Sequence, residues 1–94
     1  MGEFAAEVFA PTEPDWLERH VERATEAARA MSGEGVPVRL VRSILMPHDE
    51  VCIDLFTAPS AGAVREVIRR AGYRAARITQ AVVAPTRTPP RRRW

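Results

Sequence analysis

The chain has 94 residues, 46% of them apolar, and this length fits one small domain with a thin core. No apolar run approaches the roughly 18 residues of a membrane span, and the N-terminus lacks the basic start and apolar segment of a signal peptide, so we expect a cytoplasmic protein. The single cysteine, Cys52, excludes an internal disulfide and a four-thiolate zinc site within one chain.

The formal charge is +2 at pH 7, and all fourteen basic residues are arginines. Four of them, Arg87 and residues 91–93, stand near the C-terminus, and the remainder carries −2 because these four contribute +4 of the total. Nucleic-acid-binding domains usually present a clearly basic surface. We therefore do not expect the folded part to bind nucleic acid.

The first predicted strand covers residues 3–9, where side chains alternate with a period of two. A helix is predicted over residues 15–32, with Thr12 as a capping residue and Gly33 at its end. His20 lies at the rim of this helix and is predicted to be structural. The predicted inner face of the helix carries Leu17, Val21, Ala24, Ala28 and Met31.

Two further strands, residues 36–46 and 51–57, flank a turn at residues 47–50. The turn pairs Met46 with Val51, and the rest of the register follows from that pair. The predicted partners are Ile44 with Ile53, Leu45 with Cys52, Ser43 with Asp54, and Arg42 with Leu55.

A second helix is predicted from its cap at Ser60 to its stop at Gly72. A last strand follows at residues 76–83. Residues 85–94, rich in proline and arginine, are predicted to form a disordered tail behind a domain of residues 1–84. The predicted inner face of the second helix carries Val64, Val67, Ile68 and Ala71.

The order strand, helix, strand, strand, helix, strand predicts an α+β, ferredoxin-like βαββαβ fold. Such a fold has a four-stranded antiparallel sheet with two helices on one face and the first and third strands in the centre.

The face of the sheet away from the helices is predicted to hold the functional site. We assign Phe4, Val8, Ile44, Val51, Ile53 and Leu55 to the helix-covered face. The open face then carries Glu7, Phe9, Val41, Ser43, Leu45, Cys52, Asp54 and Phe56. Since five of these eight are apolar residues or cysteine, this face is predicted to pack against a second copy in a homodimer.

Two acids on this face, Glu7 and Asp54, would then lie in a partly dry space between the sheets. A buried carboxylate is paired, protonated or bound to a cation, and Ser43 can donate a hydrogen bond to Asp54. These three residues and Cys52 form the predicted ligand-binding set. The alternative is that the acids are exposed, or pair with Arg39 or Arg77 across the dimer seam.

Other residues carry weaker functional signals. His48, in the turn, is a candidate metal ligand together with Glu7 and Asp54. Cys52 is predicted to be a small buried hydrophobe and not a nucleophile, because no histidine is visibly placed to activate it. Trp16 is predicted to be a packing residue.

Four segments carry a resemblance to a known family: PHDE at residues 47–50, the cysteine-bearing strand at 51–56, APS at 58–60 and RAG at 70–72. They resemble a family of small bacterial proteins, common in actinobacteria and first catalogued as a domain of unknown function. The match spans about residues 36–78.

This resemblance implies a ferredoxin-like fold and a homodimer. Some relatives bind nickel, so it also implies a divalent transition metal such as nickel as the cofactor. In those relatives, histidines on the first strand and after the Ala-Gly pair contribute to the metal site. In this chain the first strand has no histidine, and Tyr73 follows Gly72.

Three functions therefore follow as hypotheses. The first is a dimer that binds a small molecule or metal ion between its sheets. The second is a cofactor-free oxygenase or isomerase with Asp54 or Glu7 as acid or base, since burial raises a carboxyl pKa into a useful range. The third is a plain interaction module without a pocket.

Overall fold

The computed structural model describes residues 1–84, and the predicted tail at residues 85–94 lies outside the described residues. The elements are β1 (Gly2–Phe9), α1 (Trp16–Gly33), β2 (Arg39–Met46), the short 3-10 helix η1 (Pro47–Asp49), β3 (Val51–Ala58), α2 (Ala61–Arg70) and β4 (Ala75–Ala81). This order confirms the predicted ferredoxin-like α+β fold. Within residues 1–84, no helix is both long enough and apolar enough to span a membrane.

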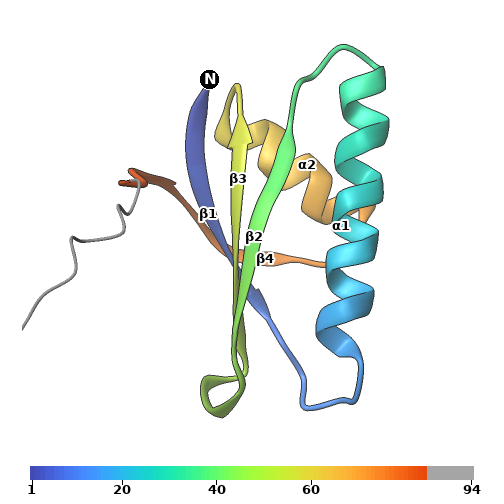
Figure 1. Ribbon diagram of the computed structural model, residues 1–94, viewed down its shortest axis with the longest axis vertical. Helices are drawn as coiled ribbons and strands as arrows, with labels where there is room; N and C mark the ends of the chain where they lie inside the picture. Colours follow the sequence, from blue (N-terminus) through green and yellow to red (C-terminus); the bar gives the residue numbers. More distant parts are fainter. Residues whose placement is uncertain (85–94) are drawn as a thin grey trace, which may run out of the picture.

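The four strands form one antiparallel sheet in the order β2-β3-β1-β4, so β1 and β3 are central as predicted. Both helices lie on the same side of the sheet (Figure 1). The hairpin register is also as predicted, with Met46 opposite Val51 and Ser43 opposite Asp54. A bulge between Leu40 and Arg42 interrupts the pairing of β2 near its start.

From Ser43 to Phe56 the two faces of the β2–β3 hairpin are the reverse of the sequence assignment, whereas Val41, in the bulge, is exposed as predicted. Every second residue of β3 is buried beneath the helices, namely Cys52, Asp54, Phe56 and Ala58. The aliphatic set Val51, Ile53 and Leu55 lies on the open face, where Ile44 is 44% exposed. The period of two was correctly recognised, but it distinguishes two faces without saying which one meets the helices. Hydrophobicity indicated the wrong face for β3, because it assigns a carboxylate to solvent, whereas buried hydrogen-bond partners stabilise Asp54 beneath the helices.

Helix α1 begins at Trp16, one residue later than predicted, and Thr12 does not cap it. The N-cap is Asp15, in the left-handed region at φ 63°, without a side-chain capping bond. The buried stripe consists of Trp16, His20, Ala24, Ala27, Ala28 and Met31. The predicted Leu17 and Val21 are only half-buried, so the inner face of the first two turns is rotated by one residue toward His20.

Helix α2 matches its prediction closely. The Ser60 hydroxyl accepts a hydrogen bond from the Ala63 N–H at 3.2 Å, and Gly72 ends the helix with φ 90°. All four predicted inner residues are buried, namely Val64, Val67, Ile68 and Ala71. Arg70 donates to Glu34, just after α1, at 2.9 Å, which joins the ends of the two helices.

Replacing Ser60 by alanine removes this cap and should lower the free energy of unfolding by about 1 kcal/mol. Urea denaturation followed by circular dichroism measures the change. Ser60→Asp is the matched control, because an aspartate in the same place also caps. Equal stability of Ser60→Ala and the parent would contradict the assigned cap.

Candidate metal centre

The carboxylate of Asp54 is the centre of a buried polar cluster. Asp54 is 0% exposed, and its Oδ1 atom accepts a hydrogen bond from the Ser43 hydroxyl at 2.7 Å. Its Oδ2 atom shares a hydrogen bond of 2.7 Å with Nε2 of His20. Three elements therefore meet at one side chain: α1 supplies His20, β2 supplies Ser43, and β3 supplies Asp54. A buried charge requires such partners, because an unpartnered carboxylate in an apolar core is strongly unfavourable.

The imidazole of His20 is held between two aromatic rings and is 0% exposed. Trp16, one turn earlier in α1, stacks on it with centroids 4.6 Å apart and planes 9° apart. Tyr73 contacts it edge-on at 4.5 Å. Within residues 1–84, the Nδ1 atom of His20 is buried without a hydrogen-bond partner. Such an atom normally costs free energy, and it lies on the edge of the ring that faces away from Asp54.

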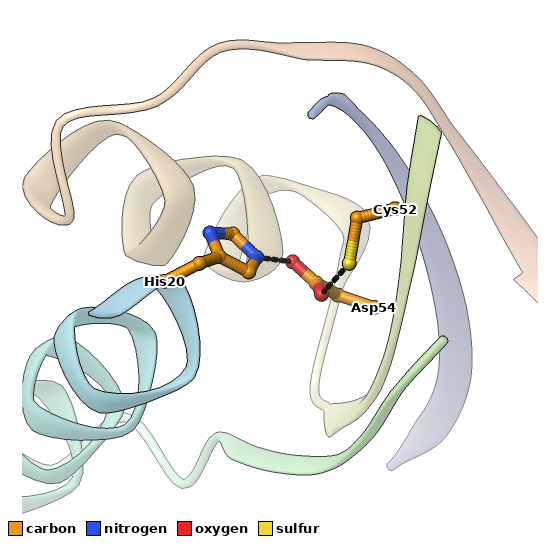
Figure 2. A group of neighbouring side chains, drawn as sticks. All are labelled: His20, Cys52 and Asp54. Carbon is orange, nitrogen blue, oxygen red and sulfur yellow. Dashed lines mark hydrogen bonds and ion pairs between the residues drawn. The ribbon is translucent and has the colours of Figure 1, made fainter. Parts of the chain in front are cut away.

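Cys52 completes the cluster from the same strand as Asp54. Its thiol donates to Oδ1 of Asp54 over 3.5 Å, and its side chain is fully buried (Figure 2). Burial, and next the nearby Asp54 carboxylate, raise the pKa of the Cys52 thiol to about 12. In this state the thiol is protonated and unreactive, as expected for a buried cysteine. Figure 2 shows His20 directed at Asp54 from the opposite side of the carboxylate.

The cluster offers three kinds of metal-binding atom. A nitrogen of His20, the sulfur of Cys52 and a carboxylate oxygen of Asp54 all lie within 4.8 Å of one another. Imidazole, thiolate and carboxylate are the usual ligands of zinc and of related divalent transition metals. Ser43 would act as an outer partner that orients the Asp54 carboxylate.

The structure brings together three of the four predicted ligand-binding residues: Ser43, Cys52 and Asp54. It confirms the expected hydrogen bond from Ser43 to Asp54. It places them between the sheet and the helices, however, so the expectation of a site on the open face is wrong for these three. The reason is the reversed hairpin, which turns Asp54 toward His20.

The remaining candidates lie elsewhere. Glu7 is on the open face, opposite Ile53, with a carboxylate oxygen 3.9 Å from Nε of Arg77 in the same chain. Arg77 is one of the two arginines that the alternative interpretation named, although the pairing is within one chain. His48 lies exposed in η1. Neither residue belongs to the cluster around Asp54.

The sequence pattern placed His20 at the rim of α1, so the third member of the cluster was not among the predicted site residues. The signal was present in the spacing Trp16, His20, Ala24, Ala28, with small or aromatic residues at every fourth position. Leu17 and Val21 are more hydrophobic than His20. The predicted inner face of the helix was therefore displaced by one residue from the buried one. Trp16 was correctly predicted to pack, and its partner is the His20 ring.

The fold and the cluster define a small ferredoxin-like domain with a polar centre beneath its helices. The solved structure of SCO4226 from Streptomyces coelicolor A3(2) has a similar fold, with a TM-score of 0.66 and 24% sequence identity. The likeness covers 88% of this chain and 99% of that one. No protein-family model matches this chain, and no curated protein does. At this identity the likeness establishes the fold alone.

The raised pKa of Cys52 predicts a thiol that resists modification while the protein is folded. We expect Ellman's reagent at pH 8 to react slowly with the native protein and rapidly in denaturant, since only a small thiolate fraction exists at a pKa of about 12. Absorbance of the released thionitrobenzoate gives both rates. Rapid stoichiometric reaction of the native protein would contradict the burial of Cys52.

Proposed function

We propose that the protein binds a divalent transition metal of the zinc, cobalt or nickel group through His20, Cys52 and Asp54. The observation that carries the proposal is the grouping of three different ligand atoms, all in fully buried residues, within 4.8 Å of one another. The nitrogen that faces the other two ligand atoms is Nε2 of His20, which lies 2.7 Å from Oδ2 of Asp54, whereas Nδ1 points away from the cluster (Figure 2).

The present spacing of the ligand atoms is compatible with a metal after small side-chain rotations. Ligands at about 2.0–2.3 Å from a tetrahedral ion stand about 3.5 Å apart. The His20–Asp54 contact of 2.7 Å would lengthen when an ion entered, and the thiol would approach. Binding requires loss of the thiol proton, so the free energy of metal binding must exceed the cost of ionising Cys52.

The ligand types argue for borderline metals over hard cations. Magnesium and calcium require several oxygen ligands, and this cluster offers one carboxylate. A mixed nitrogen, sulfur and oxygen set suits zinc, cobalt or nickel. The family resemblance of residues 36–78, which includes nickel-binding relatives, favours nickel within this group. The enzyme hypothesis receives less support, because Asp54 is fully buried and its carboxylate already contacts three side chains.

Metal titration tests the proposal directly. Cobalt(II) added to metal-free protein should produce a thiolate-to-cobalt charge-transfer band and raise the melting temperature. At a hundredfold excess over Kd, the free energy of unfolding should rise by about 2.7 kcal/mol. Cys52→Ser should abolish the charge-transfer band, and Asp54→Asn should weaken binding.

His48→Gln is the matched control, because it removes the exposed histidine and leaves His20 in place. The control should bind cobalt as the parent does. Loss of binding in His48→Gln, or unchanged binding in Cys52→Ser, would show that the metal binds elsewhere. Absence of any band or stabilisation with cobalt, zinc and nickel would end the proposal.

We also propose that the open face of the sheet joins two copies of the chain. Its large side chains are apolar, namely Phe9, Ile44, Met46, Val51, Ile53 and Leu55, and Phe9 is 62% exposed. Charges of both signs lie on the same face, with Glu3 and Glu7 on the central β1 and Arg39, Arg42 and Arg77 on the outer strands. A surface with both signs and an apolar centre is complementary to itself under a twofold axis.

Substitution at the centre of this face tests the dimer. Analytical ultracentrifugation at micromolar concentration should give a dimer for the parent and a monomer for Ile53→Lys, because a lysine there is desolvated in the interface. Ala30→Lys, at an exposed site on α1, should remain dimeric. A monomeric parent at this concentration would refute the proposed interface.

A further inference from the structure

We infer that a pocket beside the N-terminus of α1 binds a small, uncharged aromatic molecule. The pocket has a volume of about 310 Å³, within the range of small-molecule sites. Most of its wall is apolar and comes from three stretches of chain: the β1–α1 connection, α1 and the end of β2 with its turn. The apolar wall residues are Ala10, Pro11, Pro14, Trp16, Leu45 and Pro47.

The charge of the pocket wall selects a neutral ligand. Glu13 is the charged side chain in the wall, and Arg19 donates to its carboxylate at 3.2 Å. Arg19 also donates to the carbonyl of Pro14 at 3.2 Å. The Glu13 charge is thus already paired, and the wall offers no free cation to an anion. The hydroxyl of Thr12 remains as a polar group for one hydrogen bond.

The chemistry of the wall favours a ring. Trp16 contributes an indole, and Pro11, Pro14 and Pro47 contribute rigid aliphatic rings that pack well against aromatic faces. The Trp16 ring is held in place from inside the protein by its stack on His20 at 4.6 Å. A ligand therefore meets a wall whose side chains lose little conformational freedom on binding.

The backbone around the pocket is also fixed before any ligand arrives. The Ala10 N–H donates to the Glu50 carbonyl at 2.8 Å, which joins the β1–α1 connection to the β2–β3 turn. Asp15 and Glu50 have φ values of 63° and 52°, and among residues 1–84 they are the non-glycine residues with positive φ. Both border the pocket-forming segments, where such strained conformations persist only if their surroundings enforce them.

The pocket touches the proposed metal centre through the stack of Trp16 on His20, but binding of the probe requires no metal, and the experiment uses the metal-free full chain. 2-Naphthol serves as a neutral probe and 2-naphthoate as its anionic counterpart, with affinities measured by isothermal titration calorimetry. Intermolecular NOEs should connect 2-naphthol to the Leu45 methyl groups and the Trp16 indole. Thr12→Trp, an exposed position in the wall, should weaken 2-naphthol binding about fivefold or more, which corresponds to about 1 kcal/mol.

Arg29→Trp is the matched control, since it adds the same side chain at an exposed site farther along α1. It should leave the affinity for 2-naphthol unchanged. NOEs to Leu45 and Trp16, with preference for the neutral probe, support the pocket. Equal affinity for both probes, no measurable binding of 2-naphthol, or NOEs to other residues would overturn the inference. A protein that binds 2-naphthol without binding cobalt would refute the metal proposal alone.

Discussion

The partnering of the buried Asp54 carboxylate is the constraint on which this structure depends. A charged or polar group of this kind is tolerated in a core only when donors surround it, and here they come from α1, β2 and β3. The contact with His20 fixes the rotation of α1 against the sheet. The contact with Ser43 supports the hairpin register. The same requirement therefore sets the packing of the helix and brings the imidazole, the thiol and the carboxylate together.

The fold followed from sequence because its determinants are local. The hairpin register depends on a short turn, the end of α2 on Gly72, and its start on the Ser60 cap. The strand order follows from the element order. The helix-facing side of the hairpin depended instead on a long-range contact between residues 20 and 54, which no local pattern contains.

The site residues on β2 and β3 could be predicted from the sequence, but the face of the sheet on which they lie could not. Because cross-strand register alone brings Ser43 opposite Asp54, their hydrogen bond could be expected. His20 could not be assigned to the same site, because Leu17 and Val21 are more hydrophobic and indicate a different buried face of the helix. Because the hairpin faces are the reverse of the prediction, the open face is more aliphatic than expected. It carries Ile53 and Leu55 in place of Cys52 and Phe56. The case for a covered open face thus persists with a different set of residues.

The buried cluster, the open sheet face and the pocket beside Trp16 are three different sites of one small domain. Only the cluster combines complete burial with three ligand types, so it carries the central claim. Anomalous X-ray diffraction from crystals grown with cobalt(II) locates the ion without reference to activity or stability. The account predicts an anomalous peak within bonding distance of the His20 imidazole, the Cys52 sulfur and an Asp54 oxygen. A peak at His48 or Glu7, or none inside the protein, would contradict it.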